Sequence, residues 1–131
     1  MNKSQDQIIE WQKQAQYDLD TAEAMLKTGR FIYCVFMCHL SLEKILKGLY
    51  AKKHNKVPPK VHSLVYLVQI QNFKLPPLIT KFLEFLDEVS VPTRYPDQLD
   101  QLLGVYDKKR TQEIFKQAQE AFRCLNEKLK K

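Results

Sequence analysis

The chain has 131 residues, of which 44% are hydrophobic and 27% are charged. This length is typical of one domain, and we expect residues 1–131 to fold as a single unit. No apolar run approaches the roughly 20 residues that a membrane span needs. The first residues are polar and lack the apolar segment of a secretory signal. The three cysteines, an odd number, fit reduced thiols better than a disulfide framework. These features predict a cytoplasmic protein without a membrane partner.

The formal net charge is +6, with the lysines scattered along the chain. A basic chain is compatible with an anionic partner such as a nucleotide or RNA. Small basic proteins without such a partner are also common, so the charge alone does not decide between these classes.

The first part of the chain follows a helical pattern. Hydrophobic residues recur at steps of three and four over residues 8–26, and Gly29 is placed to end this helix in the left-handed conformation. A second helix is predicted over residues 31–50. It is apolar nearly all round as far as Leu42, which is typical of a helix in the middle of a bundle. The short connection predicts that these two helices are antiparallel neighbours.

Prolines and capping residues divide the rest of the chain. Ser63 is the expected N-cap of a short helix, and Pro77 lies in the first turn of a fourth one. Asp107 is expected to cap a last helix that runs to the C-terminus. The segment 91–106 has two prolines, one glycine and no sustained period, so we expect an ordered loop with at most one helical turn.

All six prolines fall at or between these expected helix ends, and no segment alternates as a strand would. The predicted fold class is therefore all-α: an antiparallel up-and-down bundle of four main helices plus one short helix.

Glu43 is the one carboxylate in the apolar central helix. It shares a helical row with Phe36, His39 and Tyr50, so we expect it to be half-buried. A half-buried carboxylate needs a cation or hydrogen-bond donors. Lys47 follows one turn later, in the favourable orientation for an ion pair that is worth about 0.2–0.5 kcal/mol at a surface.

Four sequence landmarks stand in order over nearly the whole chain. They are Trp11-x3-Ala15-x2-Asp18-Leu19, then Ser41-Leu42-Glu43-Lys44-x2-Lys47-Gly48-Leu49, then His62-Ser63-Leu64, and finally Thr93-Arg94-Tyr95-Pro96. Together they resemble the HEPN domain family (higher eukaryotes and prokaryotes nucleotide-binding), in its small stand-alone prokaryotic form.

The resemblance implies a helical bundle that usually forms a homodimer. It also implies a protein of the kind often encoded beside a minimal nucleotidyltransferase, with which it acts as a toxin–antitoxin or nucleotide-handling pair.

The chain departs from the ribonuclease members of the family, which carry an Arg-x4–6-His motif. Arg94 is followed by no histidine, because His39, His54 and His62 all lie upstream. The departure argues against ribonuclease activity, and no catalytic residue is assigned. If the chain has catalysis, His62 is the residue that we expect to carry it.

The candidate ligand-binding residues are Glu43, Lys47, His62, Arg94 and Tyr95. One interpretation is functional: Arg94 reaches Glu43, and the carboxylate holds the guanidinium at a groove at a dimer interface. The guanidinium then binds a phosphate. The other is purely structural: a helical ion pair, with Arg94 bonding loop carbonyls. Tyr95 either stacks on a base or packs the loop, and His62 either acts as an acid or base or fixes its own loop.

Two further groups have a functional and a structural interpretation. The cations Lys108, Lys109 and Arg110 open a helix, where they either bind an anion or are simply solvated. Cys34 and Cys38 lie one turn apart beside a histidine, but tetrahedral zinc needs four converging ligands. We therefore predict no metal and no cofactor.

Three functions follow from these observations. The first is a dimeric module that binds a nucleotide or phosphate ligand, or docks a nucleotidyltransferase partner. The second is a metal-independent endoribonuclease toxin that uses Arg94 and His62. The third is a partner protein without a ligand, or one that is itself nucleotidylated on Tyr95 or Tyr106.

Overall fold

The computed structural model describes residues 3–131, with side chains from residue 5 onward. It contains six helices, and no strand occurs in the described range: α1 (Lys3–Lys27), α2 (Phe31–His54), α3 (Leu64–Gln69), α4 (Pro77–Arg94), α5 (Leu99–Val105) and α6 (Lys108–Lys130). The all-α prediction is confirmed. The bundle has two short helices, α3 and α5, where the sequence predicted one.

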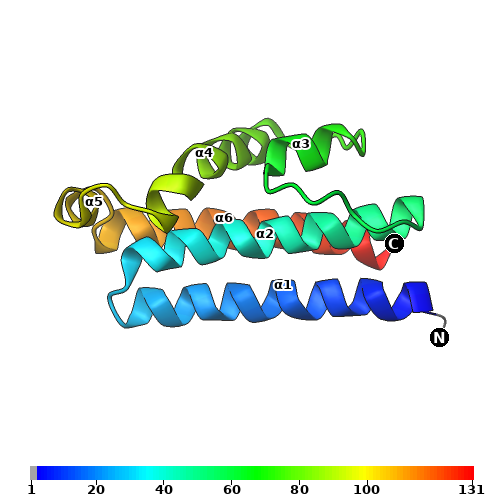
Figure 1. The fold of residues 1–131 in the computed structure, drawn as a ribbon, viewed down its shortest axis with the longest axis horizontal. Helices are drawn as coiled ribbons and strands as arrows, with labels where there is room; N and C mark the ends of the chain where they lie inside the picture. The colour runs from blue at the N-terminus through cyan, green and yellow to red at the C-terminus, as the bar shows by residue number, and fades with distance from the viewer. Residues whose placement is uncertain (1–2) are drawn as a thin grey trace.

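Helix α2 is the central element, and it contacts every other helix of the described chain. Figure 1 shows α1 along one side of it, α6 behind it, and α3 with α4 along the opposite side. The four long helices alternate in direction. The burial of α2 explains the placement, since the consecutive residues Ser41, Leu42 and Glu43, whose directions differ by about 100° around the helix axis, are all buried. Gly48 lets α1 approach closely, because a Cβ there would lie 3.1 Å from the Cβ of Trp11.

The predicted helix ends at Gly29, Ser63 and Asp107 are confirmed. Gly29 ends α1 with φ +78°. Helix α2 runs four residues beyond the predicted range, to His54, and Asn55 caps it with φ 53°. The Ser63 hydroxyl accepts a hydrogen bond from the Tyr66 amide at 3.1 Å, and the Asp107 carboxylate accepts one from the Arg110 amide at 2.9 Å. Short polar side chains therefore cap α3 and α6.

The segment 91–106 is more helical than predicted. Helix α4 continues through Pro92 to Arg94, so the prediction that every proline lies at or between helix ends is wrong. Pro92 removes only one amide donor near the end of the helix, where the cost is smaller than in its middle. The hydroxyl of Thr93 adds a hydrogen bond to this last turn, because it donates to the carbonyl of Val89 at 2.7 Å. This extension decides where Arg94 lies.

None of the helices in the described chain is both long and apolar enough to cross a membrane.

Candidate functional site

Glu43 lies at the centre of a polar cluster on α2. Only 4% of its surface is exposed, so it is more deeply buried than the half-buried position expected from the sequence. Lys47 donates to its Oε2 atom at 2.9 Å. The Nδ1 atom of His62 lies 3.2 Å from each carboxylate oxygen. The structure thus brings together three of the five predicted site residues.

A second carboxylate, Asp87 of α4, joins this cluster through a buried histidine. His39 is 1% exposed and lies between the two acids. Its Nε2 atom is 3.0 Å from Asp87 Oδ1, and its Nδ1 atom is 4.0 Å from Glu43 Oε1. Carboxylate and imidazole groups therefore alternate in the order Asp87, His39, Glu43 and His62.

Asp87 also holds the beginning of α3. Its carboxylate accepts hydrogen bonds from the amides of Leu64 at 2.8 Å and Val65 at 3.0 Å, and from the Ser63 hydroxyl at 3.0 Å. Burial alone would raise the pKa of Asp87, but hydrogen bonds from His39 and from the start of α3 outweigh it and leave the pKa below its ordinary value. A helix of six residues is too short to be stable by itself, so these bonds fix α3 and the preceding His62.

His62 is the accessible member of the cluster. Its side chain is 69% exposed, whereas that of Glu43 is 5% exposed. A buried carboxylate thus orients the ring through Nδ1, while Nε2 makes no hydrogen bond within the described chain. This arrangement suits a histidine that donates or accepts a proton, or that presents an N–H to an anion.

Arg94 does not reach Glu43, so the predicted contact between them is wrong. The only side chains that pair with Glu43 in the described residues are those of His39, Lys47 and His62. The guanidinium of Arg94 instead lies over the ring of Phe36, 4.6 Å from its centre. Phe36 precedes Glu43 by two helical turns on the same face, about 10 Å along the axis.

The course of α4 explains this position. The helix runs antiparallel to α2, so Asp87 meets His39 and the end of α4 lies further toward the start of α2 (Figure 1). Because the helix continues through Pro92, Arg94 is its last residue rather than a free loop residue. Tyr95 follows as the C-cap and is 73% exposed.

The other candidate groups lie apart from Glu43. The guanidinium of Arg110 lies 5.7 Å from the ring centre of Phe85 and 5.8 Å from that of Tyr106. Lys108 and Lys109 are exposed in the first turn of α6. Tyr106 is 4% exposed and therefore inaccessible to modification in this fold, unlike Tyr95.

The two cysteines of α2 are buried. A hydrogen bond with Cys34, together with burial, raises the pKa of Cys38. The neighbouring His39 faces Asp87 and Glu43. No group of three or more histidine, cysteine or acidic side chains in the described part of the chain is arranged to hold a metal ion.

Sequence reasoning missed Asp87, and it listed His39 on the row of Glu43 without assigning it a role. The i,i+4 spacing of His39 and Glu43 could have suggested that they meet. No local signal marks Asp87, because its partners lie 22 to 48 residues away along the chain.

Comparison with known proteins identifies the fold. The model of the HEPN domain matches residues 8–128. The protein TT1696 from Thermus thermophilus is 26% identical to this chain with a TM-score of 0.80, and the match covers 98% of this chain and 99% of that one. ST0689, an archaeal HEPN homologue, is 25% identical with a TM-score of 0.72 and the same coverage. No curated protein matches this chain.

The buried polar cluster therefore sits in an all-α helical bundle, and this chain belongs to the HEPN domain family. Membership of this family supports a nucleotide-related role for the chain in general terms.

Replacing Asp87 by Asn tests whether its carboxylate fixes α3. A hydrogen bond to a charged group contributes about 1.5–3 kcal/mol, so we expect Asp87→Asn to lower the free energy of unfolding at neutral pH by about 2 kcal/mol. The pKa of Asp87 is lowered in the folded state, so this contribution is present above the ordinary value of 3.8 and is lost as the pH falls through the folded pKa. Urea unfolding at a series of pH values should show the two proteins converging in acid.

The matched control is Glu88→Gln, at the neighbouring exposed position of α4. It should leave stability nearly unchanged. A pH-independent difference between wild type and Asp87→Asn would contradict the assignment.

Proposed function

We propose that this chain is a nucleotide- or phosphate-ligand-binding module whose site lies along one face of α2, between His62 and Arg94. The observation that carries the proposal is the pair of accessible donors on this face. His62 is oriented by Glu43, and the half-buried guanidinium of Arg94 lies over Phe36 without a carboxylate partner among the described residues. Two such donors, about 10 Å apart along α2, suit a phosphate-bearing ligand.

In this proposal Glu43 and Lys47 support the site rather than contact the ligand. Lys47 is 8% exposed and its ammonium is neutralised by Glu43. Their role is to orient His62, since an imidazole bonded to a buried carboxylate loses rotational freedom. Tyr95, exposed beside Arg94, offers a ring on which a base can stack.

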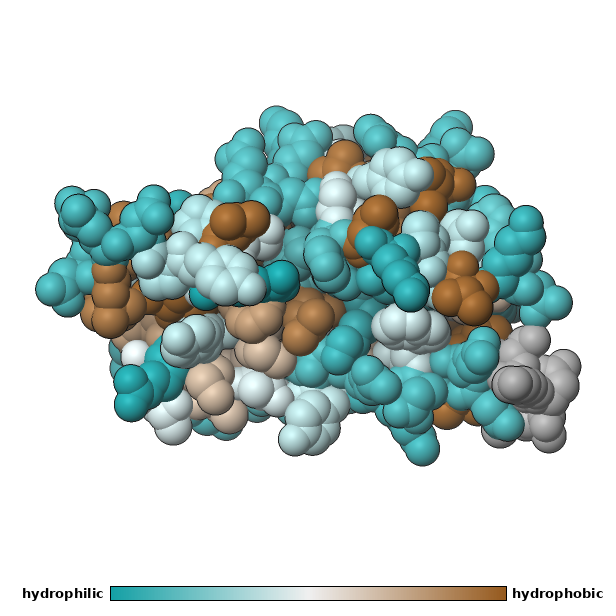
Figure 2. Space-filling view, viewed as in Figure 1, coloured by the Kyte–Doolittle hydropathy of each residue, from teal (hydrophilic) through white to brown (hydrophobic). Residues whose placement is uncertain are grey.

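Homodimer formation is part of the proposal, and exposed apolar side chains near Arg94 support it. Figure 2 shows apolar and weakly polar surface between charged side chains at the α5 end of the bundle. The end of α4 and helix α5 contribute Val91, Tyr95, Leu99, Leu103 and Val105, each between 44% and 73% exposed. A second copy that covers this surface would place two Arg94 side chains near one groove.

The partner and the biological setting are proposals as well. We propose that the module is paired with a nucleotidyltransferase-type protein in a toxin–antitoxin-like unit in the cytoplasm. Tyr95 is the exposed candidate for modification by such a partner, in contrast to the buried Tyr106.

The second candidate function is that of a metal-independent endoribonuclease. The geometry that favours it is the pair of Glu43 and His62, in which a buried carboxylate orients an exposed imidazole. This pair would replace the missing histidine downstream of Arg94.

Ligand binding is tested by thermal shift and calorimetry with AMP, ATP and inorganic pyrophosphate. A ligand at 100 times its dissociation constant should stabilise the wild type by about 2.7 kcal/mol. Arg94→Ala should lose most of this response because the free guanidinium is removed. Arg123→Ala, exposed on α6, should keep it. An equal response of wild type and Arg94→Ala would remove Arg94 from the site.

Homodimer formation is tested by light scattering during gel filtration. We expect a dimer for the wild type and a monomer for the double variant Leu99→Glu/Leu103→Glu, because two charges on the proposed interface oppose its burial. Leu78→Glu, at an exposed position at the start of α4, is the control and should remain dimeric. A wild type that is monomeric at about 100 μM would contradict a stable dimer.

Ribonuclease activity is tested by incubating the protein with tRNA and mRNA in the presence of a chelator. If the second candidate is right, RNA is cleaved and His62→Ala reduces the rate by about 100-fold or more. Unchanged cleavage by His62→Ala would point to a contaminating nuclease, and no cleavage by the wild type would leave the binding module as the function.

A further inference from the structure

His39 has a ring nitrogen that its surroundings leave without a hydrogen-bond partner. The residue is 1% exposed, and its Nδ1 atom is buried without a hydrogen bond to any described residue. Buried polar atoms in folded proteins nearly always have a partner, so such an exception calls for an explanation. Oε1 of Glu43 lies 4.0 Å from this nitrogen, which is beyond the range of a hydrogen bond. The unpaired atom therefore lies next to a carboxylate that it does not bind.

The other ring nitrogen fixes the tautomer of His39. Its Nε2 atom lies 3.0 Å from Oδ1 of Asp87. Asp87 is ionised at neutral pH, because hydrogen bonds hold its pKa below the ordinary value, and an ionised carboxylate only accepts hydrogen bonds. Nε2 therefore carries the hydrogen, and Nδ1 of the neutral ring has a lone pair. Two acceptors, this nitrogen and the Glu43 carboxylate, thus lie close together without a proton between them.

The charged groups around His39 come from α2, α4 and the loop before α3. They are Glu43 and Lys47 of α2, Asp87 of α4, His62 of the loop, and Arg94 of α4, which lies over Phe36 one turn earlier on α2. Other groups are engaged elsewhere: Asp18 of α1 binds Lys44 at 2.8 Å, the thiols of Cys34 and Cys38 bond to each other, and Arg110 of α6 lies over Phe85 and Tyr106. Helix α3 carries no charged residue, and Asp100 of α5 is exposed. The two carboxylates that flank the ring therefore favour a positive charge on it.

The Glu43 carboxylate is held firmly at only one of its oxygens. Lys47 donates to Oε2 at 2.9 Å. In contrast, Nδ1 of His62 lies 3.2 Å from both oxygens, at the long limit of an N–H···O hydrogen bond. The last torsion of a glutamate side chain has a broad range of accessible angles. Oε1 can therefore turn toward His39 while Oε2 stays on Lys47.

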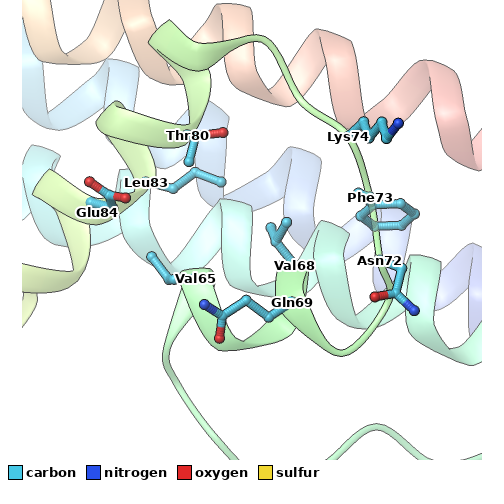
Figure 3. A pocket seen from close by; sticks show the side chains of 9 residues that line it. All are labelled: Val65, Val68, Gln69, Asn72, Phe73, Lys74, Thr80, Leu83 and Glu84. Carbon is cyan, nitrogen blue, oxygen red and sulfur yellow. The ribbon is translucent and has the colours of Figure 1, made fainter.

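Solvent reaches this cluster from the side of His62 and Asp87. Their side chains are 69% and 19% exposed. The hollow between α3 and α4, which Figure 3 shows from close by, is lined by Val65, Val68, Leu83 and their neighbours, and none of the cluster residues belongs to its lining. A proton therefore enters the cluster near the accessible imidazole and not through this hollow.

We propose that His39 is a proton switch for the site along α2. While its ring is neutral, Glu43 binds the Nδ1–H group of His62, so the accessible Nε2 atom of His62 is fixed as an acceptor. When Nδ1 of His39 takes up a proton from solvent, it becomes a donor and Oε1 of Glu43 turns to it. His62 then loses its contact with that oxygen, and its ring is free to rotate and to exchange tautomers. The switch rests on the function proposed above, since it assigns the regulation of the same site.

The switch is tested by titrating the full ¹⁵N-labelled chain from about pH 8 to about pH 5, the range in which histidines change charge, and following the ring nitrogen signals by NMR. We expect the hydrogen of His39 on Nε2 at the upper end and proton uptake on Nδ1 at the lower end. The His62 signals should change with their own titration and again with that of His39. In His39→Gln the second change should be lost, because the amide can still donate to Asp87 but takes up no proton.

The matched control is His54→Gln. His54 belongs to the same helix but lies away from the cluster, with its ring 4.4 Å from that of Tyr50. This variant should keep both changes of the His62 signals. If His39→Gln does not fold, the wild type still decides, because the tautomer of His39 and the coincident changes at His39 and His62 are measured on the unaltered chain.

Identical titration curves of His62 in the wild type and His39→Gln would overturn the proposal. It would also be overturned by a neutral His39 that carries its hydrogen on Nδ1, or by a His39 that takes up no proton above about pH 5.

Binding of inorganic pyrophosphate separates the switch from the ligand site. Because acid releases His62 only in the wild type, lowering the pH from about 7.5 to about 5.5 should raise the dissociation constant about five-fold more in the wild type than in His39→Gln. An equal effect of pH on both proteins would overturn the regulation. A wild type that binds no pyrophosphate but shows both changes of the His62 signals would support the switch and contradict the ligand site.

Discussion

A carboxylate inside a helical bundle must be paired, because an isolated buried charge is strongly destabilising. Glu43 meets this constraint with one ammonium and two imidazoles. Lys47 and His39 come from the same helix and His62 from the loop before α3, while His39 also connects to Asp87 of α4. Glu43 therefore ties the loop before α3 to α2, while His39 and Asp87 tie α4 and the start of α3 to the same helix.

The same constraint separates supporting residues from accessible ones. Glu43, Lys47 and His39 are each at most 8% exposed, and they hold one another in place. His62 and Arg94 reach the surface on the face that these residues support. His62 is oriented by the carboxylate of Glu43, and Arg94 lies on the ring of Phe36. Asp87 extends these contacts to α3, because its carboxylate fixes the start of that helix.

The sequence was sufficient for features that depend on neighbouring residues. Gly29, Ser63 and Asp107 end or begin helices through their own backbone or side-chain preferences, and the order of four motifs was sufficient to suggest the family. The sequence was insufficient where contacts between distant segments outweigh the local signal. Pro92 indicated a helix boundary, yet the packing of α4 on α2 carries the helix past it. That error placed Arg94 in a loop free to reach Glu43, and Asp87 carried no local signal at all.

The central claim is that Glu43 and Lys47 form a buried pair on which the site depends, and a double-mutant cycle measures it directly. We expect Glu43→Gln to lower the free energy of unfolding by about 3 kcal/mol, because Lys47 is left buried without a counter-charge. The double variant Glu43→Gln/Lys47→Met should recover at least about 1 kcal/mol relative to the sum of the single effects. The exposed pair Glu23 and Lys27, 3.7 Å apart, is the control, with an expected coupling of at most about 0.5 kcal/mol. Additive effects at Glu43 and Lys47, no larger than those at the exposed pair, would contradict the account.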